Sequence, residues 1–277
     1  MSEFSRKELY DLLNRPAPLW LARINLSDAM LEFANLEGAY LQYANLGRVN
    51  LRGANLKRAD LSNAILVNAS LNNADMSGAR LLSTNMANSV FNNATLVDAR
   101  MDRCGLYMAK MNGADLSKAN LMGAVMWDAD LSEAILVETY FSLTMMTGIN
   151  LSKANLQKAY LRFAHLGQAK LVEANLEGAD VTNTYLMKSD LAGANLKKAD
   201  MRDIYLNSAS LYYADLTGAN LERATLSEAD LSSASLRGAN LKDAKLGGAT
   251  LVGTRYDAST VWPAGFNPRS EGAIEEP

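Results

Sequence analysis

The sequence predicts an all-β solenoid, and three observations predict it. From Leu26 to Leu251 every fifth residue is apolar: 36 Leu, 7 Met, 2 Phe and Val181 fill the 46 positions. The residue two places before each of these is Ala in 35 of the 46 cases, and Asn or Asp lies between the two in 22 cases. A period of five matches neither the 3.6-residue helix nor the two-residue strand. Each pentapeptide is therefore expected to form one short extended side followed by a corner.

Each position of the pentapeptide has a predicted role. In an extended stretch the small residue and the Leu face the same side, and the residue between them faces the opposite side. The other two residues turn the chain, and Gly recurs at the second of them, as at Gly38 and Gly53, where it tolerates a positive φ. Arg58, Lys118 and Glu133 occupy the same slot, so the turn does not require Gly. Stacked coils would pair their backbones and align the Leu side chains in internal ladders.

Tandem sequences such as ANLEG (34–38), ANLKR (54–58) and ADLTG (214–218) resemble the pentapeptide-repeat family. The resemblance covers residues 24–253 and implies a right-handed quadrilateral β-helix with four pentapeptides per coil, hence about 11–12 coils. An α-solenoid is the alternative, which the density of Gly and Asn disfavours. The Trp-Pro and Gly-Phe-x-Pro pattern of the tail is similar to the tails of cyanobacterial members.

The organisation predicted along the chain is a cap at 1–23, a repeat β-helix at 24–256 and a C-terminal capping tail at 257–277. Open ends of a solenoid need caps. Ser5 and Glu8 fit a capping box, which predicts a helix over about 6–13 that ends before Pro16. Trp262 and Phe266 are expected to pack on the last coil, and the end of the tail is expected to be partly disordered. The first coil would be covered by Leu9, Leu12, Leu13, Leu19 and Trp20.

No catalytic constellation is visible, which predicts that the chain is not an enzyme and uses no cofactor or metal. His165 is the single histidine, and no glycine-rich phosphate loop is present. Cys104 occupies the small inward slot and is interpreted as a buried filler. Carboxylate pairs such as Asp128 and Asp130 arise by chance in a repeat this rich in Asp. General acid–base catalysis also needs a pocket, and packed Leu ladders without a loop insertion leave none.

Composition restricts the partners and the compartment. The 27 Lys and Arg against 30 Asp and Glu give a net charge of −3, which argues against a dedicated nucleic-acid binder. No run approaches 18 apolar residues, so no membrane span is expected. The N-terminus lacks the layout of a signal peptide, and a single Cys excludes an intrachain disulfide. The expectation is a soluble cytoplasmic protein that binds neither nucleic acid nor a membrane.

If four pentapeptides make one coil, residues 20 apart stack on one face. The face whose outward columns begin at Asn25 and Ser27 is largely apolar or aromatic, and almost uncharged, from Ile65 to Tyr205. The adjoining face adds Tyr140, Leu143, Tyr160 and Phe163. Exposed apolar surface of this kind marks protein contacts. The predicted partner-binding residues are Ile65, Val67, Tyr107, Val125, Trp127, Met145, His165, Tyr185, Met187 and Tyr205.

The other surfaces are predicted to be polar. Asn72, Asn73, Asn92 and Asn93 are interpreted as an Asn ladder that stabilises turns. A group of arginines near Asp102, namely Arg80, Arg100 and Arg103, is interpreted as a solvated ion-pair surface.

The leading hypothesis is a non-catalytic scaffold that docks a protein partner, or a second copy of itself, through the apolar face. An alternative interpretation is that the outward aromatic residues only stabilise the sheet. A further hypothesis is a DNA mimic that binds a type II topoisomerase (gyrase) and protects it from quinolones, as the resemblance allows. The modest net charge, the scattered Lys and Arg and the uninterrupted register depart from that pattern.

Overall fold

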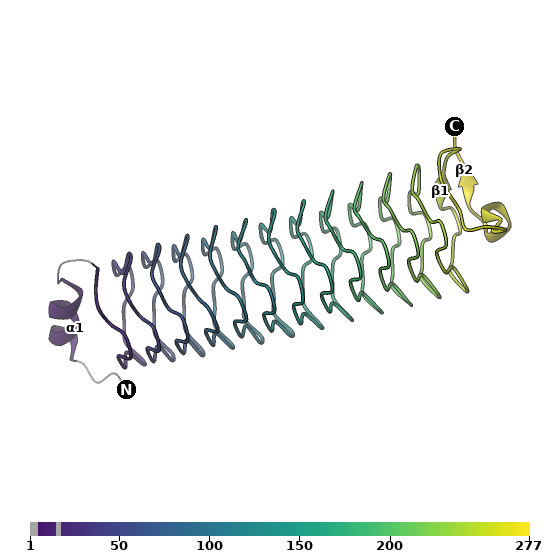
Figure 1. The fold of residues 1–277 in the computed structure, drawn as a ribbon. Coiled ribbons are helices and arrows are strands. Elements are labelled where there is room, and N and C mark those ends of the chain that lie inside the picture. Colours follow the sequence, from purple (N-terminus) through teal and green to yellow (C-terminus); the bar gives the residue numbers. More distant parts are fainter. Residues whose placement is uncertain (1–4, 15–17) are drawn as a thin grey trace. The chain divides into compact units, whose positions relative to one another are not determined.

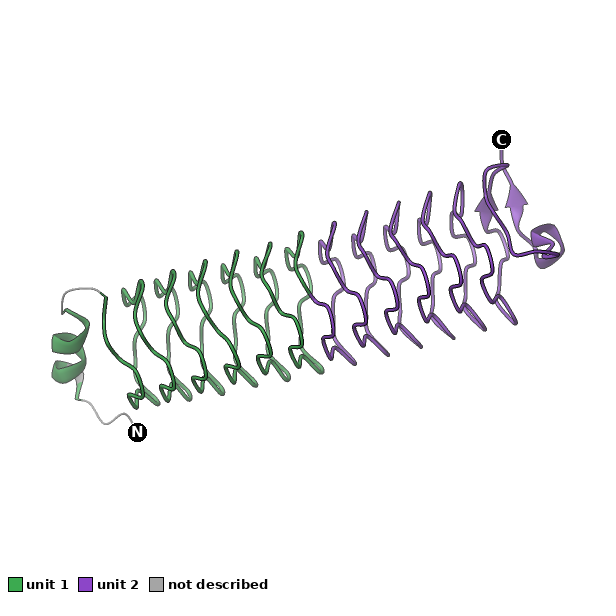
Figure 2. Cartoon of the chain, viewed as in Figure 1, with its two compact units in different colours: residues 1–140 green, residues 141–277 purple. Residues whose placement is uncertain are grey.

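The structure, a computed structural model, describes residues 5–14 and 18–277. The chain divides into two units, residues 1–140 and 141–277, which are coloured separately in Figure 2. The predicted N-terminal helix is formed and ends at Leu13, with Asn14 as its C-cap; Pro16 itself lies outside the described residues. None of the helices among the described residues has the length and apolarity needed to cross a membrane.

Both units are built from coils of 20 residues. Isolated parallel bridges join residues 20 apart, such as Asn25 to Asn45 in unit 1 and His165 to Tyr185 in unit 2. The bridges run along four faces, because each coil contributes one outward residue from each of its four pentapeptides. The residue after each bridge residue donates its N–H to the next coil, as Leu26 does to the Asn45 carbonyl at 2.8 Å. The predicted quadrilateral β-helix is therefore confirmed within each unit (Figure 1).

Every corner uses the same backbone geometry. The small residue donates its N–H to the carbonyl of the Leu three residues earlier, as Ala119 does to Leu116 at 2.9 Å. The second corner residue has a positive φ whether it is Gly or not: 64° at Gly38 but also 57° at Arg58 and 60° at both Lys118 and Glu133. This second corner residue is the third of the four residues in the turn, the position at which type II turns require a positive φ. The repeat therefore tolerates side chains at these positions at a cost in backbone strain.

The inward ladders form the core of each unit. Ala and Leu of the repeat are almost fully buried, and Phe91 and Phe141 are the largest side chains that are completely inaccessible. Met126 is fully buried, as the repeat predicts, whereas its neighbour Trp127 remains 42% exposed. Between residues 24 and 251, six inward slots hold Ser or Thr in place of Ala, and their hydroxyls donate to backbone carbonyls, as Thr84 Oγ1 does to the Leu61 oxygen at 2.8 Å. These hydroxyls are therefore accommodated without an unsatisfied donor.

Unit 1 begins with helix α1, Arg6–Leu13, which lies at the open end of the first coil (Figure 1). Its capping box is formed as predicted: the Ser5 N–H donates to Glu8 Oε2 at 2.7 Å, and the Glu8 N–H donates to Ser5 Oγ at 3.3 Å. The Ser5 hydroxyl also donates to Glu8 Oε2 at 2.7 Å, and this bond, with that from the Ser5 N–H, holds the pKa of Glu8 below its usual value. The helix shields the first coil with Leu9 and Leu12, which are buried.

The expected covering role of two further residues is not supported. Leu19 is buried as expected, but Leu13 is only half-buried. The expectation that Trp20 covers the first coil is wrong, because its side chain is 75% exposed. The reason is register, because Trp20 forms a parallel bridge with Tyr40 and so occupies an outward column, where the two rings stack at 4.1 Å.

Unit 2 ends in a tail that folds back on its last coil. Strand β1, Arg255–Tyr256, pairs in parallel with β2, Ile274–Glu275, and the 3₁₀ helix η1, Pro268–Glu271, precedes β2. The end of the tail is therefore hydrogen-bonded, which differs from the expected loose end. The bridge from Asn240 to Val261 spans 21 residues, so the register slips by one where the repeat ends. Trp262 contacts both Tyr256 and Phe266, with ring centroids 5.4 Å apart in each pair.

Candidate interaction surfaces

The surface of interest is the face whose outward columns repeat every 20 residues from Asn25 and from Ser27, here called the aromatic face. Bridge residues of the first column point outward because the flanking Ala and Leu point inward. The second column follows the Leu and opens each corner. Each unit carries its own portion of this face.

In unit 1 the aromatic face carries three contiguous apolar side chains. Gly105 forms a parallel bridge with Val125, which places Tyr107 beside Trp127 in consecutive coils. Both aromatic side chains are 42% exposed, and Val125 is half-buried. The adjoining corner residue Met108 is 47% exposed, and sequence reasoning missed it, although an apolar residue in a corner slot is a readable signal.

The remaining two residues predicted in unit 1 lie apart from this cluster. Ile65 is 47% exposed and Val67 half-buried, but Ile65 pairs with Asn85, which in turn pairs with Gly105. A coil whose first column is polar therefore separates Ile65 and Val67 from Tyr107. The structure does not join all five predicted residues of unit 1 into one apolar patch.

In unit 2 the aromatic face forms a ladder of stacked rings. Met145, His165, Tyr185 and Tyr205 are joined by successive parallel bridges. The His165 and Tyr185 rings stack with centroids 4.6 Å apart and planes at 14°, and Tyr185 stacks on Tyr205 at 4.7 Å and 4°. Met187, in the second column, is 39% exposed, as is Tyr205 at 37%, whereas Met145 and Tyr185 are half-buried. The structure thus brings all five predicted residues of unit 2 together.

Apolar side chains of the adjoining face are also exposed. In unit 1 Tyr140 is 46% exposed, and in unit 2 Leu143, Tyr160 and Phe163 are 58%, 38% and 43% exposed. A second group that sequence reasoning did not anticipate lies near the N-terminal cap, where Tyr43, 58% exposed, stacks under the Arg23 guanidinium at 5.6 Å.

Charge is concentrated away from the aromatic face. In unit 2, Asp200 pairs with Arg202 and Asp203 with Arg223 through N–O distances of 2.6 and 2.8 Å. The hydrogen bonds from these guanidinium groups hold the pKa values of Asp200 and Asp203 below their usual range. In unit 1, Arg80 pairs with Asp60 at 3.5 Å across the surface, and Arg100 with Asp102 at 4.0 Å. The arginine side chains of these pairs are solvent-exposed, as predicted, whereas the side chains of Asp60 and Asp102 are only 20% and 21% exposed.

The polar face of unit 1 contains a shallow hollow. Its volume is about 500 Å³, and its lining is polar throughout. On the same face, the Asn112 N–H donates to Asn92 Oδ1 at 3.2 Å, and the Asn112 side-chain amide donates to the Ser132 carbonyl at 3.0 Å. Asn-to-Asn contacts of this kind agree with the predicted turn-stabilising ladder. The lining residues are Glu32, Asn50, Arg52, Ser70, Asn72, Asn73, Asn92 and Asn93.

Two observations concern side chains that could carry chemistry. Cys104 is completely buried, and burial raises the pKa of its thiol, so it is not a nucleophile in the folded protein. Within residues 5–14 and 18–277, no group of three or more His, Cys, Asp or Glu side chains is arranged to hold a metal ion. The surfaces described above are suited to contact, through exposed aromatic rings and thioethers.

Coils of 20 residues, four outward columns and inward Ala and Leu ladders define a repeat β-helix. Family comparison makes the assignment specific: the model for pentapeptide repeats matches in overlapping segments from residue 21 to residue 255. The chain therefore belongs to the pentapeptide-repeat family. A search of curated proteins gave no match.

Several solved structures are similar to this chain. The protein alr5209 from Nostoc PCC 7120 is 33% identical, with 37% of this chain and 84% of that chain covered and a TM-score of 0.36. HetL from Nostoc sp. strain PCC 7120, which is involved in heterocyst differentiation regulation, is 28% identical, with 95% and 99% covered and a TM-score of 0.28. QnrB1, a plasmid-mediated fluoroquinolone resistance protein, is 19% identical, with 59% and 90% covered and a TM-score of 0.35.

Proposed function

We propose that the protein is a non-catalytic scaffold that docks a protein partner through its aromatic face. The observation that carries the proposal is the ladder of His165, Tyr185 and Tyr205 in unit 2, with the exposed Met187 beside it. Aromatic residues and Met are enriched in interface cores, where charged residues are depleted. No charged side chain stands in the first column from Met145 to Thr225.

Stacking prepares these rings for binding. Each ring of the ladder lies almost parallel to its neighbour, so its side-chain torsions are restricted before a partner arrives. Binding then loses less side-chain entropy than it would with free side chains. The ladder of stacked rings therefore combines exposed apolar surface with preorganised side chains, and both are properties of binding hot spots.

Stabilisation of the sheet alone is the competing explanation. Cross-strand aromatic pairs stabilise sheets without any partner. That explanation accounts for Tyr185, which is half-buried between two rings, but not for Met187, which stands outside the ring stack and remains 39% exposed. In unit 1, Trp127 and Met108 are exposed without any ring stack of their own among the described residues. Docking explains both groups.

Affinity capture from the source cells tests the proposal. The bait pair is the wild-type chain and a variant with Tyr185→Glu, Met187→Glu and Tyr205→Glu, shown to be folded by circular dichroism. The matched control carries Val172→Glu, Ala192→Glu and Tyr212→Glu, which lie on the next face of the same coils and add the same charge. A protein retained by the wild type and the control but lost from the first variant supports docking at the aromatic face.

The other outcomes are equally informative. Equal capture by all three chains would contradict docking by the unit 2 ladder. Sedimentation of the wild-type chain as a dimer, lost in the first variant only, would identify the partner as a second copy. A gyrase supercoiling assay distinguishes the topoisomerase hypothesis, because inhibition that survives in the first variant would assign the function to another surface.

A further inference from the structure

The last row of the aromatic face in unit 2, residues 244–248, has an open backbone edge. In the preceding coil, Leu226 donates its N–H to the Lys245 carbonyl at 2.8 Å, and Glu228 donates to the Gly247 carbonyl at 3.0 Å. Among the described residues, the equivalent N–H groups of Leu246 and Gly248 have no backbone acceptor. The Ala244 carbonyl likewise has no backbone donor within this part of the chain. Unpaired groups in a row are the template on which another strand is added.

The edge is open because the tail leaves the repeat at this point. Val261 still pairs with Asn240, and Ile274 donates its N–H to the Thr254 carbonyl at 2.8 Å. Between these two contacts the tail forms a turn, in which Phe266 donates its N–H to the Pro263 carbonyl at 3.1 Å, and then η1. The tail therefore passes the row without pairing with it.

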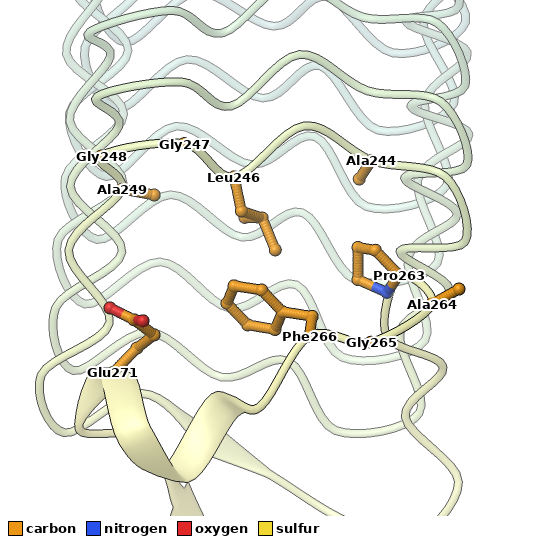
Figure 3. Close-up of a pocket in the computed structure, with 10 residues that line it drawn as sticks. All are labelled: Ala244, Leu246, Gly247, Gly248, Ala249, Pro263, Ala264, Gly265, Phe266 and Glu271. Carbon is orange, nitrogen blue, oxygen red and sulfur yellow. The ribbon is translucent and has the colours of Figure 1, made fainter.

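A hollow of about 400 Å³ lies between this row and the tail (Figure 3). Leu246 and Phe266 face each other across it, and Pro263 and Glu271 stand on its tail side. Ala244 and Leu246 each remain 8% exposed, whereas Leu226 of the preceding coil is inaccessible. The inner ladder is thus incompletely covered at the same row whose backbone is unpaired.

Lys245 sets the charge of this edge. Its side chain is exposed in the first column of the aromatic face, next to Thr225, and no carboxylate of a described residue lies within 4.0 Å of its ammonium group. In a strand that pairs with this row, the residue opposite Lys245 would also point outward. An acidic residue there would form a cross-strand ion pair.

A parallel strand fits the row in one register. Continuing the observed pattern, the residue opposite Lys245 donates its N–H to the Ala244 carbonyl and accepts from the Leu246 N–H. The following residue then points inward over Leu246, and the preceding residue points inward over Ala244. The complementary segment is therefore small–acidic–aliphatic, because the inner ladder supplies a small and a large apolar slot.

A second copy of this chain is a poor occupant of the same edge. Two copies related by a two-fold axis would pair antiparallel, and the exchange of Ala244 carbonyls and Leu246 N–H groups would place Lys245 directly opposite its own copy. Like charges directly opposite on a sheet are destabilising. The charge favours a different chain.

We propose that the row 244–248 takes up an extended segment of another protein by β-strand addition, with an acidic residue opposite Lys245 and an aliphatic residue over Leu246. Main-chain hydrogen bonds would supply affinity, and the apolar hollow and Lys245 would supply specificity. This site uses none of the residues of the aromatic ladder, so it is independent of the function proposed above.

The test uses a synthetic peptide as the probe: acetyl-Ala-Asp-Leu-Thr-Gly-Ala-Asn-amide, the sequence of residues 214–220. Titration into the ¹⁵N-labelled full chain is followed by NMR. The amide resonances of Leu246 and Gly248 are expected to move downfield, and their hydrogen exchange to slow about fivefold or more at saturation. Absence of any change in these resonances at a peptide concentration of about 5 mM would overturn the proposal.

A backbone-methylated peptide separates strand addition from nonspecific binding. Methylation of the Asp nitrogen of the peptide removes the N–H that donates to the Ala244 carbonyl, and a loss of affinity of about tenfold is expected. Equal binding of the methylated peptide would contradict backbone pairing.

Charge reversal tests the register. Lys245→Glu is expected to weaken the Asp peptide about fivefold and to favour a peptide with Lys in place of Asp. Lys242→Glu, on another face of the same coil, is the matched control and is expected to leave both peptides unchanged. Weakening by both variants alike would reduce the effect to net charge and would overturn the register. Dimerisation of the wild-type chain through this row would instead contradict the exclusion of a second copy.

Discussion

The imidazole of His165 lies parallel to the ring of Tyr185, with centroids 4.6 Å apart on the outside of unit 2. The Tyr205 ring continues the stack at 4.7 Å. Outward rings of the same chain therefore cover one another in a register set by the 20-residue coil. This arrangement leaves edges and one terminal ring available to a partner, and it makes the stability of the ladder measurable apart from its binding.

Tyr185→Ala removes the central ring and both stacking contacts. Aromatic pairs contribute about 0.5–1.5 kcal/mol each, so a loss of about 1–2 kcal/mol in the stability of unit 2 is expected. Urea unfolding followed by circular dichroism measures it. Tyr185→Phe keeps the ring and is expected to unfold at the wild-type urea concentration. Equal behaviour of the Ala and Phe variants would show that stacking contributes nothing.

Met126 and Trp127 are neighbours with opposite environments, one fully buried and the other 42% exposed. Met126→Asp places a carboxylate in the inner ladder and is expected to destabilise unit 1 by about 3–5 kcal/mol. Trp127→Glu is expected to cost less than about 1 kcal/mol, because the side chain stays in water. A Met126→Asp chain that melts like the wild type would contradict the inward assignment.

Lys118 holds a positive φ of 60° at a corner that Gly fills elsewhere. A left-handed conformation costs a residue with a Cβ about 1 kcal/mol, partly offset in a Gly variant by greater freedom of the unfolded chain. Lys118→Gly is therefore expected to stabilise unit 1 by about 0.5 kcal/mol in thermal unfolding. Lys118→Ala keeps the strain and is the control. A Gly variant less stable than the Ala variant would refute the strain argument.

Thr184 is completely buried and donates its hydroxyl to the Leu161 carbonyl at 2.8 Å. Thr184→Val has nearly the same shape but no donor, and a loss of about 1 kcal/mol is expected. The loss stays moderate because the same carbonyl also accepts from the Ala164 N–H at 3.0 Å. Thr184→Ser retains the donor and should restore most of the urea midpoint; failure to do so would assign the effect to packing.

Asp200 and Asp203 give unit 2 a predictable acid sensitivity. Hydrogen bonds from Arg202 and Arg223 hold their pKa values below the ordinary 3.8 in the folded state. A carboxylate with a lowered folded pKa contributes stability above its unfolded pKa and loses it as the pH falls toward the folded pKa. The melting temperature is therefore expected to fall below pH 4.

The matched variant, Asp200→Asn with Asp203→Asn, should show a smaller decrease in melting temperature between pH 5 and pH 3 than the wild type does. An identical pH dependence in the two chains would contradict a stabilising role of these ion pairs.

Much of the fold could be predicted because the repeat fixes which way each side chain points. Met126 and Cys104 lie inward and Trp127 outward, as the pentapeptide phase requires. Trp20 could not be assigned correctly, since the repeat pattern begins later in the chain and its phase must be extended back to reach Trp20. The pairing of the tail with β1 has no periodic signal, and it depends on a one-residue slip before Val261.

The candidate site was only partly readable. The 20-residue spacing predicts that His165, Tyr185 and Tyr205 share a column, but not that their rings stack. In unit 1 the same spacing predicts one continuous apolar patch, but Asn85 separates Ile65 from the cluster around Trp127. The open edge at 244–248 depends on where the tail leaves the coil, which composition does not encode.

Site-specific photocrosslinking tests the docking claim most directly. p-Benzoylphenylalanine would be placed at position 205, at the end of the ring ladder, or at position 212, on the next face of unit 2. Both chains would be illuminated in extracts of the source cells. Docking predicts a discrete crosslinked protein with the label at 205 and none with the label at 212. The same adduct from both positions, or an adduct from 212 alone, would contradict the claim that the aromatic face is the docking surface.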